Sequence, residues 1–161
     1  RIDPGCLKLE LTESVILGDI DTTIERMHQL RALGIRFALD DFGTGYSSLT
    51  YLKRLGAEEI KIDQSFVRDM LVDPNDLAIV QGVIGLAQAF HRNVVAEGVE
   101  TVEHGARLLP LGCHLAQGYG IARPMPAQDL AQWAAQWEPH PTWTQQTEAA
   151  SLPLADIRQL V

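Results

Sequence analysis

Short apolar runs alternate along the chain with longer stretches in which apolar residues recur every three or four positions. The short runs predict β-strands, and the longer stretches predict amphipathic α-helices. We expect five strands, over residues 6–12, 35–41, 59–63, 93–98 and 114–121. A helix is expected after each strand, at about 21–33, 49–55, 77–87, 101–111 and 126–137. Alternation of single strands with single helices is typical of a parallel α/β fold.

Turn and cap residues mark several of these boundaries. Asp19 or Asp21 can cap the first helix, and Gly34 ends it. After Glu138 the chain changes to a segment rich in Pro and Thr, which is typical of a linker. We therefore expect one domain over residues 1–138, followed by a linker and tail over 139–161.

The repeating unit narrows the architecture. Five βα units of roughly 25–30 residues resemble part of a (β/α)₈ barrel, which typically needs about 250 residues. An open doubly wound sheet is the alternative, but the phosphate-binding pattern GxGxxG of that fold is absent. Asp41-Phe42-Gly43 resembles the DFG motif of kinases, yet the chain has no Gly-rich strand-loop and no HRD motif beside it.

Composition and charge exclude several classes of protein. The 161 residues are 46% apolar, which suits one domain with an ordinary core. A formal charge of −8 argues against non-specific binding to a nucleic-acid polymer, and an anionic substrate would need bound cations. The two cysteines have no metal-ligand spacing, and the chain shows neither a secretory signal nor a long apolar span. We expect a cytoplasmic protein with no membrane segment.

Polar residues gather at the ends of the predicted strands. Asp40 and Asp41 follow the apolar run Phe37–Leu39 and precede a Gly-rich turn. Similar positions at other strand ends hold Glu10, Lys61, Glu97 and Gln117. Adjacent carboxylates beside a buried strand are costly unless a cation neutralises them. The carboxyl ends of barrel strands are also where active sites are built.

Strand alternation places these groups on one face. In the first strand Lys8, Glu10 and Thr12 alternate with leucines, and in the third strand Lys61 and Asp63 alternate with isoleucines. In a closed barrel the polar face points into the lumen, where Glu10, Asp40, Asp41 and Glu97 would converge. Four carboxylates cannot all stay ionised together without bound cations. Oxygen ligands without His or Cys favour Mg²⁺ or Mn²⁺, and two such ions could clamp a phosphodiester.

Simpler interpretations of single residues stay open. A strand-end carboxylate such as Glu10 or Glu97 can be a structural ion-pair partner, and Lys61 can pair with Glu10 or Asp63. Asp40-Asp41 can also be a helix N-cap pair. Trp133 and Trp137 are expected to pack against the barrel wall at helical spacing. The ordered set favours a functional site over any of these alone.

Five motifs in a fixed order resemble those of EAL-type cyclic di-GMP phosphodiesterases, over roughly residues 3–137. They are Glu10-Leu-Thr-Glu13-Ser, Asp40-Asp-Phe-Gly-Thr-Gly-Tyr-Ser-Ser-Leu49, Lys61-Ile-Asp63, Ala96-Glu-Gly-Val-Glu100-Thr and Gln117-Gly-Tyr. The resemblance implies a modified TIM-like (β/α)₈ barrel that hydrolyses cyclic di-GMP, a bacterial signalling nucleotide, to pGpG. The fold class we expect is therefore α/β, as the C-terminal part (about five βα units) of that barrel.

The resemblance also implies roles for individual residues. Glu10, Asp40 and Asp41 match metal ligands of the family, with Asp40 between two Mg²⁺ or Mn²⁺ ions. Lys61 matches a residue that contacts the attacking water or the scissile phosphate, and Glu97 matches a proposed general base. Asp63, Glu100 and Gln117 match further substrate or supporting positions. Glu13 matches the glutamate that fixes the loop Phe42–Ser48, which the family uses to set the aspartates and to form dimers.

The name-giving Glu-Ala-Leu segment of the family has no match in the chain, because it would lie before residue 1. The chain also begins without Met and enters a strand almost at once. We expect a fragment that follows sensory or cyclase domains in a parent protein. Such a part-barrel should hydrolyse little substrate alone, and its uncovered strand edges should favour a homo-oligomer.

Two other functions are open at this point. The chain can be a non-catalytic receptor for cyclic di-GMP or a regulatory protein-interaction module. It can also be an unrelated barrel that uses Mg²⁺, Lys and acids to enolise carboxylate substrates.

Overall fold

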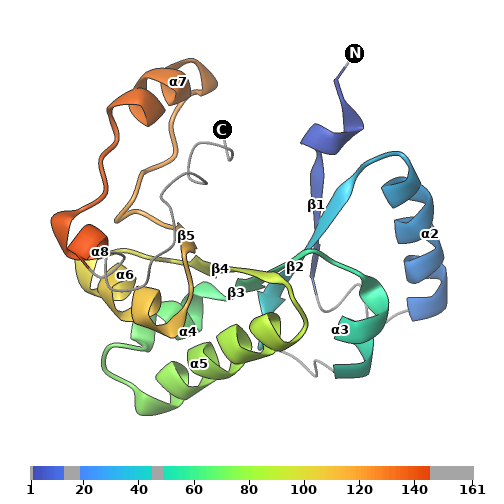
Figure 1. Ribbon diagram of the computed structural model, residues 1–161, viewed down its shortest axis with the longest axis horizontal. Helices are drawn as coiled ribbons and strands as arrows, with labels where there is room; N and C mark the ends of the chain where they lie inside the picture. The colour runs from blue at the N-terminus through green and yellow to red at the C-terminus, as the bar shows by residue number, and fades with distance from the viewer. Residues whose placement is uncertain (1, 13–18, 45–48, 146–161) are drawn as a thin grey trace.

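The computed structural model describes residues 2–12, 19–44 and 49–145. Five strands form one parallel sheet in the order β1-β2-β3-β4-β5 (Figure 1). The strands are β1 (Lys8–Thr12), β2 (Arg36–Phe42), β3 (Glu59–Ile62), β4 (Asn93–Glu97) and β5 (Leu115–Gln117). A doubly wound sheet reverses its strand order at a switch point, and the described strands show no reversal. The sequential order confirms the predicted α/β class and fits part of a barrel.

Helices α2, α3, α5 and α6 lie along one side of the sheet, whereas α7 lies apart from them (Figure 1). The helices are α2 (Ile20–Ala32), α3 (Leu49–Leu55), α4 (Gln64–Asp69), α5 (Pro74–Ala89), α6 (Val102–Leu108), α7 (Ala127–Gln136) and α8 (Pro141–Gln145). Short 3₁₀ turns occupy η1 (Pro4–Cys6) and η2 (Leu109–Leu111). Among the described residues, no helix has the length and apolar character needed to cross a bilayer.

The core lies between the sheet and these helices. Ile60 and Ile62 of β3 are fully buried, as are Val80 and Ile84 of α5. The central strand β3 therefore carries the best-packed part of the molecule. At the sheet edge Leu7 and Leu9 keep 46% and 41% exposure, although their spacing predicts a helix-facing side.

Helix caps follow the sequence signals. Asp19 caps α2 by accepting a hydrogen bond from the Thr22 amide at 3.1 Å. Asp73 caps α5 in the same way through the Asn75 amide at 2.8 Å. Gly34 has φ 99°, the left-handed conformation that ends many helices. The predicted start and stop of the first helix are thus confirmed.

Several predicted boundaries are wrong, for local reasons. The first strand starts at Lys8 instead of residue 6, because Asp3 caps the turn Pro4–Cys6. The fifth strand ends at Gln117 instead of 121, since the Ile121 and Ala122 amides both donate to the Gly118 carbonyl. The helix predicted to end at 111 gives way to η2 after Leu108.

Two short helices have no counterpart in the prediction. Helix α4 begins at once after β3, because the Asp63 side chain accepts from the Ser65 amide at 2.9 Å. Helix α8 lies inside the predicted linker and contacts α6. The domain boundary at 138 stays a prediction.

Candidate active site

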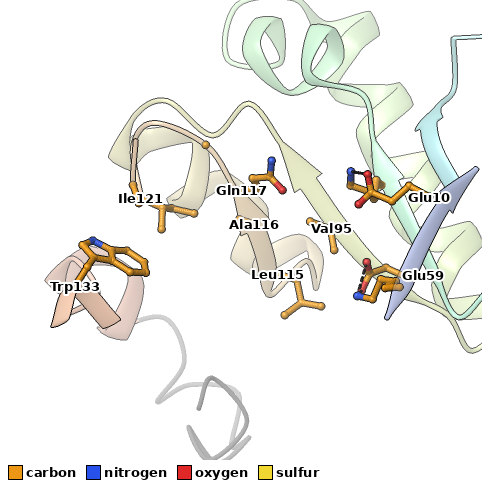
Figure 2. A pocket seen from close by; sticks show the side chains of 12 residues that line it. Glu10, Glu59, Val95, Leu115, Ala116, Gln117, Ile121 and Trp133 are labelled. Atoms are coloured by element: carbon orange, nitrogen blue, oxygen red, sulfur yellow. Dashed lines mark hydrogen bonds and ion pairs between the residues drawn. The ribbon is translucent and has the colours of Figure 1, made fainter. Parts of the chain in front are cut away.

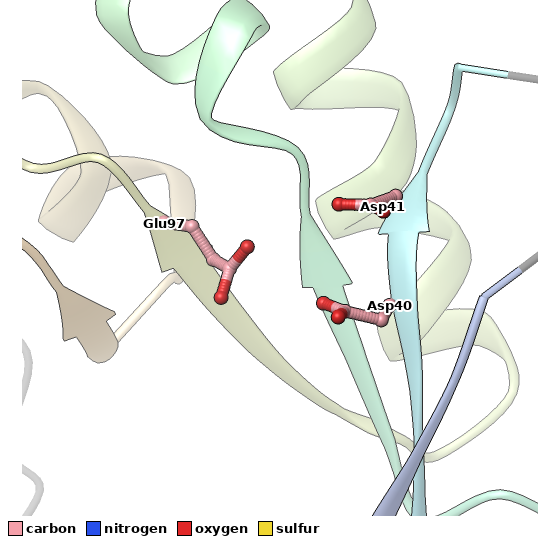
Figure 3. A group of neighbouring side chains, drawn as sticks. All are labelled: Asp40, Asp41 and Glu97. Atoms are coloured by element: carbon pink, nitrogen blue, oxygen red, sulfur yellow. The ribbon is translucent and has the colours of Figure 1, made fainter.

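Asp40 and Asp41 point toward the same region although they are neighbours in a strand. Successive strand residues normally face opposite sides of the sheet. Here the pairing of β2 with β3 shifts between Leu39 and Phe42, and Asp41 has φ 53°. This bulge turns both carboxylates toward Glu97, as Figure 3 shows. The sequence offered one signal, since Asp is among the residues that tolerate the left-handed conformation.

Three carboxylates from two strands meet at this end of the sheet. One oxygen from each of Asp40, Asp41 and Glu97 lies within 4.8 Å of the other two. Asp40 lies two residues before the end of β2 and Glu97 ends β4, and strand β3 lies between these two strands. Both side chains are largely covered, with 20% and 16% exposure.

Lys61 of β3 fills the centre of the group. Its Nζ lies 2.8 Å from Glu10 Oε2, 3.0 Å from Asp40 Oδ1 and 2.8 Å from Glu97 Oε1. The lysine is buried at 6% exposure, whereas the Glu10 side chain keeps 47%. The structure thus brings Glu10, Asp40 and Glu97 around one ammonium group. The sequence left Glu10 and Asp63 open as partners of Lys61, and the structure shows the pair with Glu10.

Burial and charge shift the pKa values of the group in consistent directions. Burial alone would lower the pKa of Lys61, but its ion pairs with the three carboxylates outweigh burial and raise it. Burial raises the pKa of Glu97 more than Lys61 lowers it. Burial, followed by repulsion from Asp40 and Asp63, also raises the pKa of Asp41. Lys61 therefore stays protonated, whereas Glu97 and Asp41 take up protons more readily than exposed carboxylates do.

The other expected site residues lie around this centre. Asp63 follows β3, caps α4 and interacts with Asp41. Gln117 is the register partner of Glu97 across β4 and β5 and is exposed (Figure 2). Glu100 is exposed in the loop after β4. Glu13 lies outside the described residues, as does the part of the Phe42–Ser48 loop at 45–48.

The loops after β4 and β5 are held against each other. The Val99 amide donates to the Gln117 carbonyl at 3.1 Å, and the Gly120 amide donates to the Val99 carbonyl at 2.8 Å. A Cβ atom at Gly118 would lie only 2.3 Å from the Val99 oxygen, so this approach requires glycine. These contacts fix Gln117 relative to the loop that follows Glu97.

A second ion pair lies on the same sheet face, farther from the carboxyl ends. Lys8 Nζ lies 2.9 and 2.8 Å from the two Glu59 carboxylate oxygens, and Figure 2 shows this pair and the Glu10 pair in one pocket. Sequence reasoning missed Glu59 as a partner of Lys8, although both alternate in phase with the site residues. The pocket has a volume of about 500 Å³. Trp133, expected to pack on the barrel wall, lines this pocket with Ile121.

The donor set fits a hard divalent cation. Asp40 Oδ1 is buried, and within the described residues its one polar partner is the Lys61 ammonium at 3.0 Å. A buried oxygen of this kind has a lone pair available to a metal ion. The surrounding ligand atoms are carboxylate oxygens, the type that Mg²⁺, Mn²⁺ and Ca²⁺ prefer. Asp40, Asp41 and Glu97 are the residues that this geometry favours as ligands.

Comparisons with known proteins agree with this geometry. Residues 1–124 match the family model described as EAL domain. The bifunctional diguanylate cyclase/cyclic di-GMP phosphodiesterase MucR of Pseudomonas aeruginosa is 46% identical over 129 residues, which are 80% of this chain and 19% of that protein. A solved structure described as the PaMucR phosphodiesterase in complex with c-di-GMP has a TM-score of 0.77 and 46% identity, and covers 80% of this chain and 52% of that one.

A second relative was solved with a metal ion. The Klebsiella pneumoniae BlrP1 complex with manganese and cy-diGMP has a TM-score of 0.71 and 36% identity, over 76% of this chain and 31% of that chain. The present chain thus spans 52% of the solved MucR phosphodiesterase chain and 19% of the full MucR sequence.

Proposed function

The chain belongs to the EAL domain family, and on that premise we propose that it carries the metal-binding rim of a phosphodiesterase that hydrolyses cyclic di-GMP to pGpG. The observation that carries the proposal is the ion-paired group of Lys61 with Glu10, Asp40 and Glu97 at the carboxyl ends of four neighbouring strands. Relatives 46% identical to the chain are named as enzymes of this class.

Mg²⁺ or Mn²⁺ is the proposed cofactor, with two ions in the complete domain. Asp40 and Asp41 would hold them, with Glu10 as a further ligand, and the BlrP1 relative binds manganese. Bound ions would neutralise phosphate charge and make a coordinated water more acidic. A Glu97 oxygen lies within 4.8 Å of oxygens of Asp40 and Asp41, so Glu97 could reach a water bound to either ion.

Lys61 and Glu97 are the proposed catalytic side chains. The Lys61 ammonium is the buried cation among the site residues of a chain with net charge −8, so it can donate to a phosphate oxygen of the substrate. The carboxylate of Glu97 can accept the proton of the attacking water, and burial, which raises its pKa, makes it a stronger base than an exposed glutamate. In the reaction the water oxygen bonds to phosphorus as the bond from phosphorus to the ribose 3′ oxygen breaks, and that oxygen takes up a proton to leave as a hydroxyl group.

Asp63, Glu100 and Gln117 are proposed to support substrate or metal from the rim. Asp63 interacts with Asp41, and Gln117 faces the pocket beside Glu10 (Figure 2). Glu13 is proposed to stabilise the loop that follows Asp41, as the family resemblance implies.

A non-catalytic receptor for cyclic di-GMP is the second candidate. It is favoured by one observation: the Lys61 ammonium already pairs with three carboxylates and offsets one of their negative charges, so these ion pairs can hold the cluster together without a metal ion. In that case the dinucleotide would bind equally well with and without Mg²⁺ in titration calorimetry. Membership of the family leaves no ground for an unrelated enolising barrel.

The proposed partners are cyclic di-GMP, a second copy of the chain and N-terminal sensory or cyclase domains. MucR, which is similar over 80% of this chain, combines a cyclase with a phosphodiesterase by its name. The proposed location is the cytoplasm, with no nucleic-acid polymer as a partner.

Asp40→Asn in the full-length protein tests the proposal. The substitution removes the charge of the most enclosed aspartate of the cluster, so we expect hydrolysis of cyclic di-GMP to fall about a hundredfold or more. Chromatographic measurement of pGpG formation in the presence of Mg²⁺ gives the rate. Asp129→Asn, on the exposed helix α7, is the matched control and should keep the wild-type rate. Near-normal turnover of Asp40→Asn would refute the assignment.

A further inference from the structure

Helix α8 lies beyond residue 124, where the match to the family model ends, and it docks on α6. Its Trp143 is partly buried, and the indole Nε1 donates a hydrogen bond to the Val102 carbonyl at 2.8 Å. The His140 ring lies edge-on to the indole, with centroids 6.3 Å apart. The contact thus joins the C-terminal side of the chain to the first turn of α6.

Gly105 provides the seat for this indole. A Cβ atom at Gly105 would lie 2.5 Å from Trp143 Nε1 and 2.6 Å from its Cε2, closer than real side chains come. The indole therefore occupies the space that a side chain would fill at this position of α6. Gly82 and Gly85 of α5 differ, because a Cβ there would meet no atom within 4 Å. Glycine is disfavoured inside a helix, and the docked indole explains why a glycine nevertheless occupies position 105.

The turn that Trp143 contacts is also tied to α4. His104 is buried, and its Nδ1 accepts from the Thr101 amide at 3.2 Å as part of a capping box. The other ring nitrogen lies 3.1 Å from the Arg68 carbonyl at the end of α4. The start of α6 is therefore held between α4 and α8.

The first turn of α6 is joined to the candidate site by the short loop after Glu97. Thr101 is four residues after Glu97, and the residues between them form the loop whose Val99 bonds both to the Gln117 carbonyl and to the Gly120 amide. Gly98 in this loop has φ 72° and lies against Gln64, so the loop has little freedom to shift alone. A movement of the first turn of α6 would be passed to Glu97 and Gln117.

We propose that Trp143 is a positioning residue, which by docking on Gly105 holds the start of α6 and with it the loop between Glu97 and Thr101. Helix α8 then acts as a clasp that keeps the site loop in place. The clasp is a statement about the fold and can be tested without any activity. Its effect on turnover rests on the proposed phosphodiesterase function.

Tryptophan fluorescence tests whether the seat exists. The chain has three tryptophans, so Trp133→Phe with Trp137→Phe leaves Trp143 as the only one. Adding Gly105→Ala should displace the indole, increase its quenching by acrylamide and shift its emission to the red. Gly85→Ala is the matched control, and it should leave both signals unchanged. Unchanged quenching with Gly105→Ala would overturn the docking.

Hydrogen exchange tests whether the seat holds the site loop. The amides of Val99 and Gly120 should exchange about tenfold faster in Gly105→Ala and in Trp143→Ala than in the wild type, because both variants release the clasp. The double variant should exchange no faster than either single variant, since each removes the same contact. Wild-type exchange rates in both single variants would overturn the proposal, whatever the protein hydrolyses.

Steady-state kinetics of the full-length protein test the catalytic consequence. Trp143→Ala and Gly105→Ala should lower kcat for cyclic di-GMP about tenfold with KM nearly unchanged, as expected for loss of a supporting contact. Trp143→Phe keeps an aromatic ring in the seat but loses the Nε1–H donor, so it should retain more of the rate than Trp143→Ala. Full kcat with faster loop exchange would show a clasp without catalytic effect and overturn the positioning role. A wild type that does not hydrolyse cyclic di-GMP would refute the proposed function and leave the exchange test of the clasp standing.

Discussion

At the scale of single residues, one ammonium group organises the candidate site. Lys61 lies on the central strand β3, and from there it contacts Glu10 of β1, Asp40 of β2 and Glu97 of β4. The ion pairs hold the group together, but one ammonium offsets only one of the three negative charges. A divalent cation that binds Asp40 and Asp41 would offset the remaining negative charge.

Cation binding is expected to weaken as the pH falls. Burial raises the pKa of Glu97 above 4.5, and burial with repulsion from Asp40 raises that of Asp41 above 3.8. Protons then compete with the cation for the same oxygens at a higher pH than they would at ordinary carboxylates. Calorimetric titration with Mg²⁺ should show affinity falling from about pH 7 toward about pH 5, with protons released on binding.

The stability of the metal-free protein should follow the opposite sign. Raised carboxyl pKa values mean that the folded state binds more protons than the unfolded state, so the free energy of unfolding falls as the pH rises through 3.8 and 4.5 toward the raised values. Mg²⁺ should restore that loss at neutral pH. An affinity for Mg²⁺ that does not change over this range would contradict the assignment of Asp41 as a ligand.

Much of the site could be predicted at this scale, since strand alternation placed Glu10 and Lys61 on one face and the structure pairs them. The bulge at Asp41 could not be predicted from alternation, because it depends on the pairing of β2 with β3. The partner of Lys8 was missed for a similar reason. A contact between β1 and β3 skips one strand and requires the register of both pairs.

At the scale of elements, local sequence signals determine where helices α2 and α5 begin, whereas tertiary contacts determine where some other elements end. The Asp caps and the terminal glycine of α2 were readable because their effect is within a few residues. Strand β5 is shorter than its apolar pattern because residues after Gln117 turn to pack on the β4 loop. Helix α8 was missed, since its docking depends on Trp143 contacting a helix about 40 residues away in sequence.

The two glycine-containing helices should respond oppositely to alanine. Gly85 of α5 is exposed with open space around its Cβ position, so Gly85→Ala should stabilise the protein by about 0.5–1 kcal/mol through helix propensity. Gly105→Ala should destabilise it, because the new methyl group displaces Trp143. Urea unfolding of both variants measures the difference. Equal stabilisation by both substitutions would mean that the α6 seat has no energetic value.

At the scale of the whole molecule, the sheet is arranged as part of a barrel. Within the described residues β1 pairs on one side only, with β2, and the leucines Leu7 and Leu9 beside that edge are about half exposed (Figure 1). An open edge with apolar neighbours favours pairing with another chain.

The 161-residue chain is therefore expected to self-associate. Light scattering over a range of concentrations should give a mass above 17.8 kDa, and Leu9→Lys should shift the distribution toward the monomer because a charge at the edge opposes pairing. Leu33→Lys is the control, since Leu33 is also an exposed leucine, at 64% against 41% for Leu9, but lies at the end of α2. A monodisperse monomer at all concentrations would show that this edge does not mediate association.

The central claim is that carboxylates from separate strands hold divalent cations beside Lys61. Anomalous diffraction from crystals of the full-length protein grown with Mn²⁺ tests it most directly, because manganese can be located independently of the protein model. We predict manganese in contact with the oxygens of Asp40 and Asp41 from β2 and of Glu10 from β1, and its loss in Asp40→Asn. Manganese bound elsewhere, with these three carboxylates left without it at saturating Mn²⁺, would contradict the account.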